Sequence, residues 1–492
     1  MDIPLSFNTI TNYKKIFSDT GYCDISAEIV VPDTQQDINR VLTSHSSITL
    51  KSKECSSGRL GVFGDAAACV TYVPEGEEDL NFLQVTIPYS SEFAVRDSDD
   101  SCFPTAEVSV CSVETKILNP RKVRVSIKLR IKAECYKHND VSIPNGQDAQ
   151  QDRLFVKSES AEITYISQLL EQSFSIENEY PFEKADGAEY KIVSSDLKII
   201  SEGTESVGAK LIVKSKAFIN LLIFDGSNLK SYDFSTVFSR LFELDDDSEK
   251  SYEITYTVNS ENYEDFDGVI NADIYATAHL ICRRMEDISF LSDAYSCSDN
   301  LNCERGELKL ENDTKQTFSA YNQLQIESET PAANIISSEF SADCELFDAE
   351  KSELPLKIKV IYTDLDGKYR AISERTQLSI SNTDGIPNNS KICGFEIGDY
   401  SVSPLGKTID IRISAQVITC AREETNINYI SEITIEDEAG ELPDSVLYLH
   451  RAGNEDLWEI AKKYRSDISR IIAINDIENG NIAGKMLLIP GY

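Results

Sequence analysis

The chain has 492 residues, 41% of them hydrophobic, and carries a formal net charge of −36 at pH 7. This length suggests three or four domains with real cores. The excess negative charge lies in residues 1–445 and argues against nucleic acid or an anionic membrane as a ligand for that region. The amino terminus has no apolar run behind a basic start, and no stretch is long enough to cross a bilayer. We therefore expect a cytoplasmic protein without direct transmembrane anchoring.

Strand patterns dominate the chain before residue 446, and they recur. Three apolar strands end in an aromatic residue ahead of a glycine turn: Tyr72, Phe224 and Tyr362. Three long alternating strands close with a cysteine: Cys135, Cys282 and Cys420. Because both landmarks repeat at intervals of roughly 140 residues, the sequence predicts three diverged β-rich modules. Strict alternation favours antiparallel sheets with one buried face, so we expect three antiparallel β-sandwich-like modules in tandem, at 1–150, 151–300 and 301–435.

Residues 436–445 form an acidic linker with Gly440 and Pro443. Like charges together with glycine and proline discourage packing and favour an extended hinge. The remaining unit, residues 446–492, is therefore expected to hang free from the β-modules.

The last unit predicts a β-α-α-β order. A short apolar run leads into an amphipathic stretch with Leu457, Ile460 and Tyr464 on one face. A second helical stretch from Ile468 stops at Asn475, and residues 486–489 form the last strand. This order, with the Leu457-Trp458 pair and the IAKKY run, resembles the LysM domain, a family best known for binding N-acetylglucosamine polymers.

The loop before the first predicted helix departs from the LysM pattern. LysM domains usually carry Gly-Asp-Thr-Leu or Gly-Asp-Ser-Leu there, as one wall of the glycan groove. Here the loop runs Gly453-Asn454-Glu455-Asp456-Leu457, one residue longer, with Asp456 in place of the hydroxyl residue. Asp456 can hydrogen-bond a sugar, or it can simply cap the helix. Trp458 is either a core residue or a contact for a partner.

We predict that a protein partner contacts the loop, the outer edge of the first predicted helix and the segment that follows the second predicted helix. The predicted partner-binding residues are Asn454, Glu455, Asp456, Leu457, Trp458, Lys462, Lys463, Arg465, Asn475, Asp476 and Ile477.

Sequence motifs for catalysis or metal binding are missing. There is no His-Glu-x-x-His, no Gly-x-Ser-x-Gly and no Cys-x-x-Cys among the twelve cysteines. Several cysteines lie on apolar strand patterns, as small buried residues do. We therefore expect no catalytic residue, no metal, no cofactor and no enzymatic activity.

Several segments of the β-modules resemble a known family. The stretches VVPDTQQDINRVLTSHSSITL, GRLGVFGDAAACVTYV and VTIPYSSEF, and DISFLSDAYS at 287–296, resemble the SPOCS domain of clostridial spore coat proteins. SPOCS-like modules followed by one LysM domain resemble a family of spore coat morphogenetic proteins. The resemblance implies a scaffold in the mother cell cytoplasm, at the outer forespore membrane and spore coat, with other coat proteins as neighbours. It also implies that the LysM domain binds the coat-basement morphogenetic ATPase.

The alternative function belongs to another class. It is a cell-wall protein that binds peptidoglycan or N-acetylglucosamine, or the targeting subunit of a wall hydrolase. A secretion signal would favour this alternative.

Overall fold

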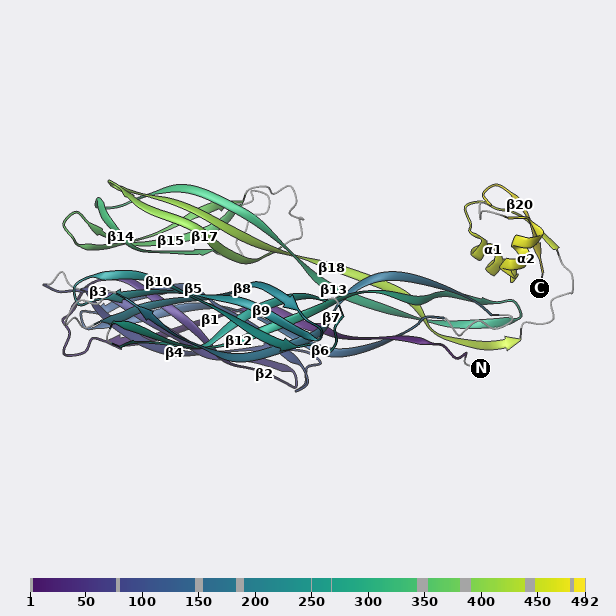
Figure 1. Cartoon of the computed structure of the whole chain (residues 1–492), viewed down its shortest axis with the longest axis horizontal. Coiled ribbons are helices and arrows are strands. Elements are labelled where there is room, and N and C mark those ends of the chain that lie inside the picture. Colours follow the sequence, from purple (N-terminus) through teal and green to yellow (C-terminus); the bar gives the residue numbers. More distant parts are fainter. Residues whose placement is uncertain are drawn as a thin grey trace.

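A computed structural model describes residues 3–76, 80–146, 154–182, 190–248, 250–266, 268–342, 353–380, 391–438, 447–477 and 482–491. These residues form twenty strands and two short helices, which confirms the prediction of a mainly β protein (Figure 1). No helix in the described ranges is long and apolar enough to cross a membrane.

The first six strands form two antiparallel three-stranded sheets. The strands are β1 (Phe7–Val30), β2 (Ile38–Ser56), β3 (Arg59–Pro74), β4 (Asn81–Ala94), β5 (Phe103–Asn119) and β6 (Lys122–Pro144). One sheet has the order β1-β6-β5 and the other β2-β3-β4. Side chains from both sheets share one apolar core, so the two sheets stabilise each other.

The same strand order occurs twice more. The second group comprises β7 (Leu154–Pro181), β8 (Lys191–Ser206), β9 (Lys210–Phe224), β10 (Leu229–Glu243), β11 (Lys250–Phe266) and β12 (Val269–Ser296). The third comprises β13 (Asp299–Glu327), β14 (Ala332–Ala342), β15 (Glu353–Asp364), β16 (Tyr369–Ser379), β17 (Lys391–Leu405) and β18 (Thr408–Glu438). Their sheets are β11-β12-β7 with β10-β9-β8, and β13-β18-β17 with β14-β15-β16. The three landmark cysteines fall on β6, β12 and β18, the last strand of each group.

Period-two alternation explains how these strands bury one face. In β6, Val123, Val125 and Leu129 are buried, while Arg124 and Lys128 between them are exposed. Each strand therefore contributes a row of apolar side chains to the core and leaves the other row in solvent.

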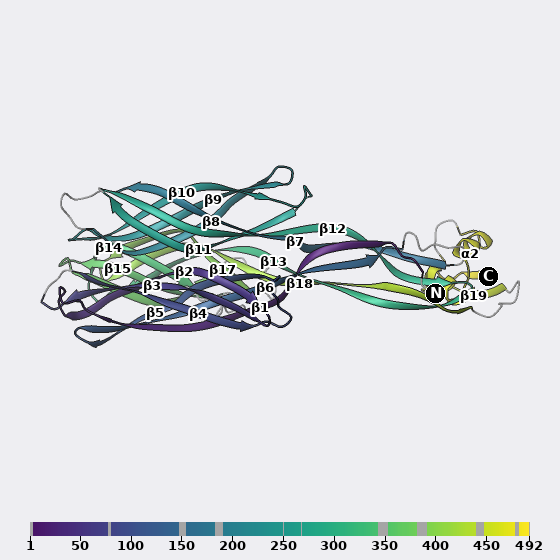
Figure 2. The ribbon, with the colours of Figure 1, turned by 90° about the horizontal axis from the view of Figure 1, so that it is seen from below.

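The first and last strands of each group extend beyond its core as a long antiparallel pair: β1 with β6, β7 with β12, and β13 with β18. Ile143, Ile163, Phe290 and Leu308 belong to an apolar cluster to which all three pairs contribute. Figure 2 shows the pairs converging into a narrow stalk. Strands far apart in the sequence therefore meet at the end of the stalk.

The carboxy-terminal unit lies at the end of this stalk (Figure 1). It consists of β19 (Leu447–Arg451), α1 (Leu457–Tyr464), α2 (Ile468–Ile474) and β20 (Met486–Pro490), with β19 and β20 antiparallel. The predicted β-α-α-β order is confirmed. The predicted linker at 436–445 starts too early, because β18 continues to Glu438; residues 439–445 lie outside the described ranges.

Candidate partner-binding site in the carboxy-terminal unit

Asp456 caps the first helix. Its Oδ1 accepts a hydrogen bond from the backbone N–H of Glu459 at 2.7 Å, and Glu459 Oε2 accepts from the Asp456 N–H at 3.1 Å. This reciprocal pair is a capping box, which satisfies backbone donors that the first helical turn leaves unpaired. The interpretation of Asp456 as an N-cap is therefore confirmed.

Glu455 ties the loop to its own unit. Its Oε2 lies 3.1 Å from His450 Nε2, and Lys463 Nζ lies 3.9 Å from Oε1. The hydrogen bond with His450 lowers the pKa of Glu455, so this carboxylate stays ionised. His450 Nδ1 in turn lies 3.1 Å from the Tyr464 hydroxyl, which links β19 to α1. Of the predicted loop residues, Asn454 is exposed and Leu457 packs against the core.

Asn475 and Ile477 hold the fold together. Asn475 Nδ2 donates to the carbonyls of Ile471 at 2.8 Å and Leu488 at 2.7 Å, and its Oδ1 accepts from the Leu488 N–H at 2.7 Å. The side chain thus joins the end of α2 to β20. Asp476 adopts a left-handed backbone with a φ of 48°, and Ile477 is buried. Asn475 and Ile477 therefore stabilise the unit from within.

Trp458 and Lys462 of α1 contact the stalk. Trp458 Nε1 donates to Asp293 Oδ2 at 2.9 Å, and Lys462 Nζ donates to Asp293 Oδ1 at 2.6 Å. The ring of Trp458 meets the ring of Tyr295 edge-on, with centroids 5.0 Å apart. After the helix, Arg465 donates to the side chain of Asn300. The sequence left open whether Trp458 is a core residue or a contact for a partner. The structure places it where α1 meets the stalk, in contact with Asp293 and Tyr295.

Apolar packing completes this junction. Tyr295 and Cys297, at the end of β12 and just after it, are buried in one cluster with Ile460 and Leu487 of the carboxy-terminal unit. The Tyr295 hydroxyl also donates to the Ser466 carbonyl at 2.9 Å. The prediction that this unit hangs free is therefore wrong. The linker composition reports only on the linker itself, whereas the docking depends on side chains of β12 far away in the sequence.

Sequence reasoning missed an exposed apolar surface on the same unit. Leu447 and Leu449 of β19 and Met486 and Leu488 of β20 are 56%, 64%, 53% and 36% exposed. We call these four residues the outer sheet face. Leu449 pairs directly with Leu488, while the alternate residues Leu487 and Ile489 point into the core. The sequence did carry a signal for this surface, because both short strands have apolar residues at successive positions. Successive residues of a strand point to opposite faces, and the core of the unit covers only one of them.

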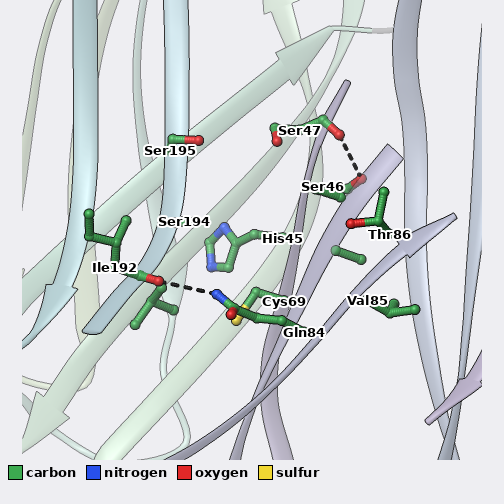
Figure 3. Close-up of a pocket in the computed structure, with 13 residues that line it drawn as sticks. His45, Ser46, Ser47, Cys69, Gln84, Val85, Thr86, Ile192, Ser194 and Ser195 are labelled. Atoms are coloured by element: carbon green, nitrogen blue, oxygen red, sulfur yellow. Dashed lines mark hydrogen bonds between the residues drawn. The ribbon is translucent and has the colours of Figure 1, made fainter. Parts of the chain in front are cut away.

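A cavity of about 280 Å³ lies elsewhere, between β2, β3 and β4 of the first group and the β8 region of the second (Figure 3). Gln84 Nε2 donates to the Ile192 carbonyl at 3.3 Å across it. His45 Nδ1 is paired with Glu339, and its Nε2 has no hydrogen-bond partner among the described residues. Burial raises the pKa of Cys69 to about 12, so this thiol stays protonated and is a weak nucleophile. The cavity is lined by none of the predicted site residues.

No family model, no curated protein and no solved structure matches this chain. The SPOCS-like and LysM-like resemblances therefore remain predictions from the sequence.

Proposed function

We propose that the chain is a non-enzymatic scaffold of the bacterial endospore coat, similar to the coat morphogenetic protein SipL. The three six-strand groups are SPOCS-like sandwich modules, and the carboxy-terminal unit is a LysM domain. This domain binds the coat-basement morphogenetic ATPase at the forespore surface. The observation that carries the proposal is the outer sheet face of the carboxy-terminal unit.

The outer sheet face is suited to a protein partner. Its four residues, Leu447, Leu449, Met486 and Leu488, are apolar and point away from the core of the unit. Small soluble units rarely leave a contiguous apolar surface in water, and such surfaces mark interaction sites. Burying apolar area gains roughly 25 cal/mol per Å², so covering these side chains contributes favourably to binding. Leucine and methionine offer no hydrogen bonds to a sugar; Arg451, which pairs with Met486, is a charged residue at the edge of this face.

The loop supports the same conclusion, because its carboxylates already have partners. Asp456 caps α1 and Glu455 binds His450. A glycan that displaced the contacts of Asp456 Oδ1 or Glu455 Oε2 would break the capping box or the pair with His450, at a cost of about 1 kcal/mol for each contact. This arrangement disfavours the alternative of a cell-wall glycan-binding protein.

The first test is binding of the full-length chain to the purified ATPase. The double variant Leu447→Ser and Leu449→Ser should weaken binding at least about tenfold, because truncating an apolar centre of an interface commonly costs more than 1 kcal/mol. The matched control is Leu365→Ser, since Leu365 is 74% exposed in the turn after β15, outside the carboxy-terminal unit. Equal affinity of the double variant and the wild type would contradict the proposal.

The second test addresses the glycan alternative directly. Calorimetric titration with chitin oligomers and with solubilised peptidoglycan should show no binding up to millimolar concentration, where binding is worth only about 4 kcal/mol. Micromolar binding to either ligand, lost in Asp456→Ala, would replace the proposed function with the alternative.

A further inference from the structure

Three cysteine thiols from separate segments meet in the first six-strand group. Cys55 lies near the end of β2, Cys102 just before β5, and Cys135 in β6. Their sulfur atoms all lie within 4.8 Å of one another, and Cys55 Sγ and Cys135 Sγ are 3.5 Å apart. Among the described residues, this is the one such group of three potential metal ligands.

The spacing of these thiols suits a tetrahedral metal ion. Zinc binds thiolate sulfur at about 2.3 Å, so two sulfurs in a tetrahedral site lie about 3.8 Å apart. The three thiols therefore need only small shifts to share one ion. Cys102 and Cys135 are part of the apolar core, and hydrogen bonds between thiols are weak, so the hydrogen bonds alone do not account for the convergence of the three sulfur atoms.

Asp99 is the carboxylate beside Cys102; it lies outside the group of three and would turn toward an ion to serve as a fourth ligand. Asp99 Oδ1 lies 3.7 Å from Cys102 Sγ, and the Asp99 backbone N–H points at the same sulfur from 3.4 Å. Lys137 Nζ lies 2.6 Å from Asp99 Oδ2. Three thiolates and one carboxylate around a divalent cation carry two negative charges, one of which the lysine offsets. Such support from surrounding residues is typical of protein metal sites.

The burial of the thiols differs in a way that allows entry of an ion. Cys135 is 0% exposed and Cys102 is 8% exposed, whereas Cys55 and Asp99 are only half-buried. An ion can therefore reach the cluster from the side of Cys55 and Asp99.

We infer that Cys55, Cys102 and Cys135, with Asp99 as the fourth ligand, form a structural zinc site. Binding Zn²⁺ releases three thiol protons and joins the segment before β5 to β2 and β6. The ligands come from positions 55, 99, 102 and 135, so no compact Cys-x-x-Cys motif marks the site in the sequence.

The test uses the full-length chain, reduced, incubated with Zn²⁺ and freed of unbound metal. Elemental analysis should give one zinc per chain, and Cd²⁺ in place of zinc should give a thiolate-to-cadmium absorption band in the ultraviolet. Cys102→Ser should weaken Zn²⁺ affinity at least about tenfold, and Asp99→Asn should weaken it less. Affinity should rise with pH, because the ligands must lose protons.

The matched control is Cys282→Ser, because Cys282 is also 0% exposed and lies in β12, the strand of the second group that corresponds to β6. This variant should keep the full zinc content. The proposal is overturned if the reduced wild type holds no stoichiometric zinc, or if Cys102→Ser binds as tightly as the wild type. A disulfide between Cys55 and Cys135 that persists in metal-free chains from cells would also overturn it. If Cys135→Ser fails to fold, the Cys102 and Asp99 variants still decide the outcome.

Discussion

Trp458 donates its indole N–H to the carboxylate of Asp293 at 2.9 Å, across 165 residues of sequence. The other carboxylate oxygen of Asp293 accepts from Lys462 at 2.6 Å. One acidic residue on the stalk thus holds two residues of α1. Trp458 is also the single tryptophan of the chain, so its fluorescence reports directly on this junction.

The first prediction concerns Asp293→Ala. The change removes one charge-assisted hydrogen bond and one ion pair, which for a partly solvated group we take as about 1–2 kcal/mol of docking free energy. The undocked population of the carboxy-terminal unit should therefore rise about 5- to 30-fold. Tryptophan emission should shift to longer wavelength and proteolysis between 438 and 447 should speed up. The control is Asp287→Ala, because Asp287 is exposed on the same strand; equal spectra for both variants would contradict the prediction.

The second prediction concerns the pH dependence of docking. Burial alone would raise the pKa of Asp293, but the hydrogen bonds from Lys462 and Trp458 outweigh it, and the pKa lies below the ordinary value of 3.8. A lowered pKa in the docked state means that docking is fully stabilised above pH 3.8 and weakens as the pH falls through the lowered value. Acid should therefore shift the Trp458 emission before the β-sheet circular dichroism signal changes. In Asp293→Asn this early step should vanish; its persistence would assign the step to another group.

The third prediction concerns the capping box of α1. Asp456→Ala removes the acceptor for the Glu459 N–H and should destabilise the carboxy-terminal unit by about 1 kcal/mol. Hydrogen exchange of residues 457–464 in the full-length chain should accelerate about fivefold. Asp456→Asn serves as the matched variant, because asparagine caps helices about as well as aspartate. If both variants exchange alike and fast, charge rather than capping is the main contribution of Asp456.

The fourth prediction concerns the junction between the first and third groups. Lys15 Nζ of β1 lies 2.6 Å from Asp313 Oδ2 of β13 and 3.3 Å from Glu134 Oε1 of β6. The side chain of Lys15 is 14% exposed, so Lys15→Met leaves two partly buried carboxylates without their shared cation. Breaking such a pair should cost about 3 kcal/mol, measured by denaturant unfolding at pH 7. Lys14→Met, at the exposed neighbouring position, should cost less than about 0.5 kcal/mol.

The variant Lys15→Met should also change how the stability of the fold depends on pH. Burial would raise the pKa of Glu134, but the charges of Lys15 and Lys132 hold it at about 2, below the ordinary 4.5. Glu134 therefore stabilises the fold above pH 4.5, and this contribution is lost as the pH falls from 4.5 to 2. Without Lys15 the pKa should rise, and acid unfolding should start at a higher pH than in the wild type. An unchanged acid transition would mean that Lys132 alone accounts for the lowered pKa.

The sequence by itself determined the local structure of this protein. Alternation in β6 fixed which side chains face inward, because successive residues of a strand point to opposite sides. Asp456 ahead of an apolar helical face fixed where α1 begins, because the first turn needs an acceptor for its free N–H groups. The spacing of Cys135, Cys282 and Cys420 pointed to the three corresponding last strands of the groups.

Only the tertiary structure decided which of these elements meet. The contact of Trp458 with Asp293, the burial of Tyr295 beneath α1 and the convergence of Cys55, Cys102 and Cys135 all join segments distant in the sequence. No periodic pattern encodes such pairs, because each depends on how the strands of different sheets are placed in space. The carboxy-terminal unit was expected to be free because its linker has an acidic composition that favours an extended chain. That composition governs only the stiffness of the linker, whereas docking depends on complementary surfaces on the two parts that the linker joins.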